Sequence, residues 1–176
     1  MKLIRSFFSL SLCLSLCLCL SLLSNGGAQA EPLGHPVAKP ILVISGKIAN
    51  TNVGDTAQFD RDMLEALGLE TVETANPWYD GRVRFEGVSI DKLMRLVGAE
   101  GTKVTAVALN DYVSSLPMED FKKFNVILAM KRDGKYMPVR DKGPLFIIYP
   151  YDSNPALRTQ TYYTRSAWQV AKIVVE

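Results

Sequence analysis

The sequence predicts an α+β fold in which a mixed sheet is combined with short helices. Short apolar, β-branched runs recur along the chain, and such runs are typical of strands. Only a few segments combine helical spacing of apolar residues with a capping residue before them and a glycine after them. Turn residues join many of the strand-like runs directly, which favours a largely mixed or antiparallel sheet.

The expected strands follow from apolar runs, and turn residues bound several of them. The run at 41–48 is rich in apolar and β-branched residues, which predicts a strand buried on both faces. Asn110-Asp111 and Asp133-Gly134 are typical of tight turns between strands. The predicted strands cover residues 41–48, 70–74, 82–86, 102–109, 112–116, 126–130, 145–149 and 168–175. We expect Trp168 to pack in the core from the last of them.

The expected helices are short, and each has a recognisable beginning. Asp60 caps a predicted helix that runs to Leu67 and stops at Gly68. Ser89 caps a second helix over residues 90–97, which places its apolar side chains on one face. A helical turn is predicted from Pro117 to Phe121. The segments 76–81 and 151–161 are expected to be mostly loop.

The first thirty residues have the pattern of a secretory signal peptide. Lys2 and Arg5 precede an uncharged run, and the segment closes with Ala28-Gln29-Ala30. We therefore expect cleavage after Ala30 and export to the periplasm or out of the cell, with no stable membrane insertion afterwards. An uncleaved anchor is the alternative, because the apolar run is about long enough to span a bilayer. Residues 31–40 are expected to be a proline-rich tether, and residues 41–176 the domain.

The expected cleavage changes the composition in two ways. Loss of Lys2 and Arg5 leaves 18 basic and 18 acidic residues, so a nucleic-acid partner recognised by bulk positive charge is not expected. All three cysteines lie in the apolar leader run, which leaves the mature chain without a disulfide, a thiolate nucleophile or a cysteine-held metal. The one histidine, His35, lies in the tether, so a histidine-based catalytic or zinc site is not expected either.

The loop after the strand at 70–74 is the first candidate binding segment. It contains Asn76, Trp78, Tyr79 and Arg82, and a ring could stack on Trp78 while the Arg82 guanidinium meets an anionic group. A buried Trp at the base of a loop is the structural alternative.

Two further segments are candidates for binding. Asn110, Asp111 and Tyr112 offer an amide and a carboxylate that can recognise a heterocycle, although Asn and Asp also favour turns. The segment 131–142 has five cations and two anions, which suits a phosphate or carboxylate but equally a solvated hairpin. The candidates there are Arg132, Arg140 and Lys142. Convergence of Trp78, Asn110, Tyr112 and Arg140 on one concave surface would support a binding site.

The order of motifs resembles the molybdopterin-binding oxidoreductase domain of the sulfite oxidase superfamily, in particular its short exported members. The motifs are Pro77-Trp78, Phe85-Glu86-Gly87-Val88 before a helix, Ala108-Leu109-Asn110-Asp111-Tyr112, Leu128-Ala129, Gly143-Pro144 and Trp168-Gln169-Val170. The resemblance implies a mixed α+β fold. It also implies a molybdenum atom held by the cofactor's dithiolene and by one cysteine thiolate in the segment 71–80. This chain has no cysteine there.

The absence of a cysteine that could ligate molybdenum determines which function we expect. We expect an exported, non-catalytic relative that binds a small anionic ligand or a partner such as a membrane signalling protein, with no metal and no cofactor. A sensory role is consistent with this expectation. The alternative is an oxidoreductase that holds the molybdopterin cofactor without a cysteine, with solvent oxygen or Asp80 as the remaining metal ligand. A purely structural or assembly protein is the third possibility.

Overall fold

The computed structural model describes residues 32–176. The predicted signal peptide and its cleavage site lie outside the described residues. Within residues 32–176, none of the helices has both the length and the apolar composition needed to cross a membrane.

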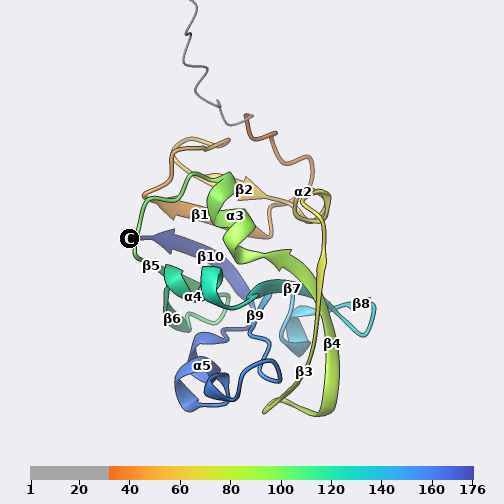
Figure 1. The fold of residues 1–176 in the computed structure, drawn as a ribbon. Helices are drawn as coiled ribbons and strands as arrows, with labels where there is room; N and C mark the ends of the chain where they lie inside the picture. The colour runs from red at the N-terminus through yellow and green to blue at the C-terminus, as the bar shows by residue number, and fades with distance from the viewer. Residues whose placement is uncertain (1–31) are drawn as a thin grey trace, which may run out of the picture. The chain divides into compact units, whose positions relative to one another are not determined.

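One sheet is mixed and has five strands in the order β2-β1-β10-β5-β6 (Figure 1). The first and last strands of the described residues, β1 and β10, pair in parallel, and all other pairs in this sheet are antiparallel. The strands are β1 (Leu42–Gly46), β2 (Ala57–Phe59), β5 (Lys103–Ala108), β6 (Val113–Pro117) and β10 (Val170–Val175). The predicted α+β class with a mixed sheet is confirmed.

The second sheet is antiparallel and has the order β3-β4-β7-β8, with β9 also paired to β7. Its strands are β3 (Glu70–Asn76), β4 (Tyr79–Ser89), β7 (Ile127–Arg132), β8 (Lys135–Tyr136) and β9 (Phe146–Ile148). Glycine is required on β4 at Gly87, because a Cβ atom there would lie 2.2 Å from the Leu128 carbonyl oxygen of β7.

Within residues 32–176, four short α-helices connect the strands, and side-chain caps begin two of them. Asp60 accepts a hydrogen bond from the Met63 amide at the start of α2, and Ser89 accepts one from the Lys92 amide at the start of α3, as the sequence predicts. The helices are α2 (Arg61–Ala66), α3 (Ile90–Leu96), α4 (Met118–Lys123) and α5 (Gln160–Arg165). Two 3₁₀ turns cover Val139–Asp141 and Pro155–Leu157.

The apolar side chains form a main core and a smaller cluster on the two sides of β7. Leu128 and Met130 of β7 belong to the main core, to which β1, β5, β10 and helix α3 also contribute. Ile127 and Ala129 of β7 face the smaller cluster, where Trp78, Tyr79 and Trp168 pack against Phe85 and Phe146. Because β7 is buried on both sides, its residues 127–130 are continuously apolar.

Several local expectations differ from the structure. The strand β1 alternates between buried and partly exposed residues, because only one side of its sheet is covered by the main core. The predicted loop at 76–81 is the tip of a long hairpin of β3 and β4. A helix, α5, begins at Gln160 within the predicted loop 151–161.

The proline-rich residues before the domain are held against it. The Asp60 carboxylate accepts hydrogen bonds from the Val37 and Ala38 amides, each at 2.9 Å. The Asn52 amide donates to the Gly34 carbonyl oxygen at 2.7 Å. The segment expected to be a tether thus makes specific contacts with the loops around β2.

Candidate functional site: an aromatic pocket

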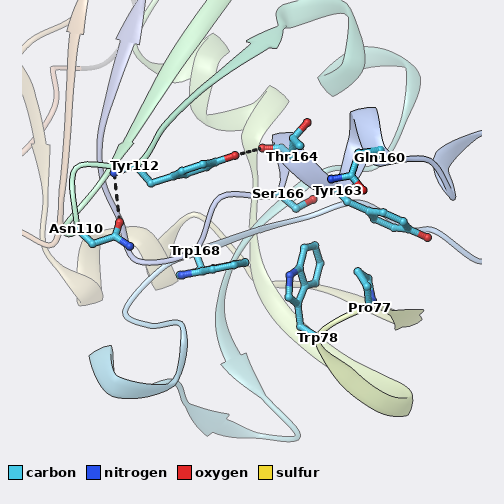
Figure 2. A pocket seen from close by; sticks show the side chains of 9 residues that line it. All are labelled: Pro77, Trp78, Asn110, Tyr112, Gln160, Tyr163, Thr164, Ser166 and Trp168. Carbon is cyan, nitrogen blue, oxygen red and sulfur yellow. Dashed lines mark hydrogen bonds between the residues drawn. The ribbon is translucent and has the colours of Figure 1, made fainter.

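Four segments that are distant in the sequence form one pocket of about 350 Å³. The tip of the β3–β4 hairpin, the β5–β6 turn, helix α5 and the segment before β10 each contribute side chains (Figure 2). The lining residues are Pro77, Trp78, Asn110, Tyr112, Gln160, Tyr163, Thr164, Ser166 and Trp168. None of these side chains is charged.

The aromatic rings of this pocket stand at steep angles to one another. Trp78 lies edge-on to Trp168, with ring centroids 5.9 Å apart and planes at 77°, and it meets Tyr163 at 6.1 Å and 81°. In Figure 2 the rings of Tyr112 and Trp168 lie one above the other, both nearly edge-on, with open space between them. This arrangement suits a flat ring inserted between Tyr112 and Trp168, with Trp78 as the end wall.

Side-chain hydroxyls of the β5–β6 turn and of β6 donate to a backbone carbonyl of helix α5 at the upper edge of the pocket. The Tyr112 hydroxyl donates to the Thr164 carbonyl oxygen at 3.0 Å, and the Ser114 hydroxyl donates to the same oxygen at 2.9 Å. The Asn110 side-chain oxygen accepts a hydrogen bond from the Tyr112 amide at 3.3 Å (Figure 2). The Asn110 side-chain nitrogen then remains as a donor toward a ligand edge.

Unusual backbone geometry is concentrated next to this pocket. Four non-glycine residues in the described part of the chain have φ angles in the left-handed region; two of them flank pocket residues, and a third bonds to one of those two. Asp111 (63°) lies between Asn110 and Tyr112, and Gln169 (55°) follows Trp168. The carbonyl oxygen of Lys142 (φ 64°) accepts a hydrogen bond from the Gln169 amide at 3.0 Å. Such conformations cost free energy in residues other than glycine and are enriched at binding sites.

A cationic cluster adjoins the pocket through Lys142. The Lys142 ammonium lies 5.7 Å from the Trp168 ring centroid and 4.7 Å from that of Tyr79, while Arg132 lies 4.4 Å from Tyr79. Arg132 pairs with Asp141 at 2.9 Å, and the Tyr79 hydroxyl donates to Asp141 at 3.1 Å. Burial raises the pKa of Tyr79, so it remains a neutral phenol. No carboxylate within residues 32–176 pairs with Lys142.

The candidate residues from the sequence are therefore distributed over more than one place. Trp78, Asn110 and Tyr112 line the pocket together, whereas Arg140 is exposed and does not line it. Asn76 accepts the Trp78 amide at 3.1 Å and so shapes the hairpin tip. The positive φ of Asp111 makes it a turn residue.

Arg82 does not stand beside Trp78 in the way the sequence suggests. It forms ion pairs with Glu73 at 3.2 Å and with Asp152 at 3.3 Å, and it lines a separate, broad depression of about 710 Å³. The physical reason is that Val83 and Phe85 are the buried positions of β4, so Arg82 lies on its exposed side, whereas Trp78 at the hairpin tip packs against the smaller cluster. An anionic group stacked on Trp78 would thus not meet Arg82.

Trp168 also differs from the expectation of a core residue. It is only half-buried and lines the pocket before β10 begins at Val170. The sequence does not predict helix α5, which carries Gln160, Tyr163 and Thr164. Its signals are weak but present, because Thr159 is a residue type that often precedes a helix and Arg165 is a cation in the last turn.

Comparison with known proteins places the chain in a family. The model of the oxidoreductase molybdopterin binding domain matches residues 58–152. The chain belongs to this family. No curated protein matches the chain. The family match includes Trp78, Asn110 and Tyr112, whereas α5 and Trp168 lie beyond its end.

The residues present do not fit a molybdenum atom held by a protein thiolate. The segment 71–80 contains no cysteine. Thr74 is buried in this segment. Its hydroxyl donates a hydrogen bond to the Ala75 carbonyl oxygen and accepts one from the Asp152 amide, so both bonds occupy the hydroxyl. Within residues 32–176 no three His, Cys, Asp or Glu side chains come together as a metal site. The uncharged pocket lining also contrasts with the multiple negative charges of a molybdopterin cofactor.

Proposed function

We propose that this chain is an exported, non-catalytic member of the molybdopterin-binding oxidoreductase family that uses the aromatic pocket to bind a small planar ligand. The observation that carries this proposal is a ring-lined, uncharged pocket in a family domain without the expected thiolate ligand. The family supplies the scaffold, but the function depends on the side chains of the site.

The pocket geometry supports an anionic heterocycle as the ligand. Tyr112, Trp168 and Asn110 all line this pocket, so a flat ring would stack between the two aromatic rings with the Asn110 amide at its edge. A negative substituent of that ring would be attracted by Lys142, which lies over Trp168 and has no carboxylate partner in the described chain. Occupancy of this pocket would alter the contact between α5 and the β5–β6 turn, and a membrane signalling protein is the kind of partner that could detect such a change.

A titration with pterin-6-carboxylate, a planar anionic heterocycle, tests the binding proposal. Stacking on Trp168, with Trp78 in contact at the end wall, should quench tryptophan fluorescence in a saturable manner. Asn110→Ala should weaken binding roughly tenfold or more, because it removes a hydrogen bond at the ligand edge. Lys142→Met should weaken it in a salt-dependent manner, whereas Arg82→Met, the matched loss of a cation outside the pocket, should leave it unchanged. Equal effects of the two cation variants would contradict the proposal.

Elemental analysis of the protein purified from its exported compartment tests the non-catalytic assignment. We expect molybdenum far below one atom per chain. Stoichiometric molybdenum with pterin would instead support the oxidoreductase alternative. In that case redox turnover with an artificial electron acceptor should be lost in Asp80→Asn if Asp80 ligates the metal. Asp80 is exposed at the start of β4 and does not line the pocket.

A further inference from the structure

The rings of the pocket continue into the interior as an unbroken series of oxidisable side chains. From Trp78 the ring centroids lie 6.1 Å from Tyr163 and 6.3 Å from Tyr151. Tyr151 lies 5.3 Å from Tyr163 and 6.3 Å from Tyr149. Indole and phenol rings lose single electrons more readily than aliphatic side chains, and electron exchange between rings is fast when they are nearly in contact.

The series reaches Tyr149, a phenol that is bonded to a base and whose ring also lies 5.2 Å from that of the partly exposed Tyr162. Tyr149 is fully buried, and its hydroxyl donates to Asp120 at 2.8 Å. Arg165 pairs with the same carboxylate oxygen of Asp120 at 2.8 Å. Burial raises the pKa of Tyr149 far above its ordinary value, so the residue is a neutral phenol throughout the physiological range.

The identity of this hydrogen-bond partner is informative. A buried hydroxyl requires an acceptor, but a backbone carbonyl would satisfy it without placing a charge in the core. Here the acceptor is a carboxylate that is itself 7% exposed and needs Arg165 as a counter-ion. A phenol becomes a strong acid when it loses an electron, and only a base within hydrogen-bond distance can take up its proton at once.

We propose that Trp78, Tyr151, Tyr163 and Tyr149 form a relay that moves an oxidising equivalent from the pocket to Tyr149, with Asp120 as the proton acceptor. A peroxyl radical at the pocket takes one electron from Trp78 and, with a proton from water, becomes a hydroperoxide. An electron from Tyr149 restores Trp78 by way of Tyr151, and the phenolic proton of Tyr149 passes to Asp120. The products are one hydroperoxide, one hydroxide ion from the water, a neutral radical on Tyr149 and a protonated Asp120.

The relay gives this domain a protective role that does not require a bound ligand or a metal. An oxidising equivalent that remains at the surface can cross-link exposed tyrosines such as Tyr112 and Tyr136 between molecules. On Tyr149 the radical itself is enclosed by the core, and its passage to Tyr162 is disfavoured because, within residues 32–176, no carboxylate accepts a hydrogen bond from the Tyr162 hydroxyl. It can persist there until a small diffusible reductant returns an electron.

Flash oxidation of the ligand-free exported protein tests the relay. Photogenerated tris(bipyridine)ruthenium(III), with hexaammineruthenium(III) as the quencher, oxidises rings near the surface and is too bulky to reach Tyr149. We expect a persistent tyrosyl radical by electron paramagnetic resonance. The persistent signal should be lost in Tyr149→Phe and should form more slowly in Trp78→Phe. Asp120→Asn should slow its formation and change the solvent deuterium isotope effect.

Tyr136→Phe is the matched control, because it removes a tyrosine that is 43% exposed and lies outside the series. This variant should keep the persistent signal, whereas Tyr149→Phe should show more dityrosine cross-linking than the wild type. Circular dichroism confirms that each variant folds. A persistent signal in Tyr149→Phe equal to that of the wild type, or unchanged formation in Trp78→Phe, would overturn the relay. Either result is independent of pterin binding.

Discussion

At the scale of single residues, the type of side chain was easier to anticipate than its environment. Trp78, Asn110 and Tyr112 are polar or aromatic residues in turns, and such residues in loops are common in binding sites. Trp168 is a large apolar residue of the kind that usually packs in a core. Its ring borders the pocket instead, because Trp168 precedes β10, which begins at Val170. Burial of a large ring depends on what lies opposite to it, and local sequence carries no such information.

The half-buried position of Trp168 predicts a modest role in stability. Phe146→Ala should lower the free energy of unfolding by about 3–5 kcal/mol, because Phe146 is fully buried in the smaller cluster. Trp168→Ala should cost clearly less, since part of its ring already contacts solvent. Urea unfolding of the two variants makes the comparison. An equal or greater loss for Trp168→Ala would show that the pocket is closed in solution.

At the scale of elements, segments with strong local signals were predicted well. The Asp60 and Ser89 caps and the helical spacing after Ser89 place α2 and α3 close to their predicted positions. The β3–β4 hairpin was missed at its tip because Pro77-Trp78 is not a typical two-residue turn sequence. Helix α5 has only six residues, too few to show an amphipathic repeat.

The pKa of Asp60 predicts a pH dependence at the junction of α2 and the preceding segment. The backbone amide of Ala38, together with those of Met63 and Val37, lowers this pKa by hydrogen bonding to the carboxylate. The stabilisation should be complete above the unfolded pKa of about 3.9 and should be lost as the pH falls through the lower folded pKa.

Thermal unfolding of Asp60→Asn at about pH 6 and about pH 3 tests this dependence. The variant should melt at a lower temperature than the wild type at the higher pH, and the difference should shrink at the lower pH. Asp62→Asn is the matched control, because Asp62 lies in the same first helical turn but is exposed. A difference between Asp60→Asn and the wild type that stays constant with pH would contradict this reading of the carboxylate.

At the scale of the whole molecule, the pocket exists because the fold joins distant segments. Parallel pairing of β1 with β10 brings the two ends of the domain together. The segment just before β10 thereby places Trp168 next to the hairpin that carries Trp78. A contact between residues 90 positions apart depends on the complete sheet order.

Export of the whole chain can be tested by intact mass. Protein recovered from the exported compartment should begin at Glu31, because the small residues before that position match a signal-peptidase site. Ala30→Pro should block this cleavage and leave the full-length chain in the membrane fraction. A full-length wild-type chain in the membrane fraction would favour the uncleaved anchor instead.

The sequence by itself determined the α+β class, the two capped helices, the family resemblance and the lack of a cysteine in the segment 71–80. These properties depend on residue identity and on spacing within short stretches of chain. The tertiary structure decided that Trp78, Asn110, Tyr112 and Trp168 meet at one pocket while Arg82 and Arg140 do not. It also decided that Tyr149 is bonded to Asp120. Such contacts arise from strand pairing and core packing between segments far apart in the chain, and no local pattern encodes them.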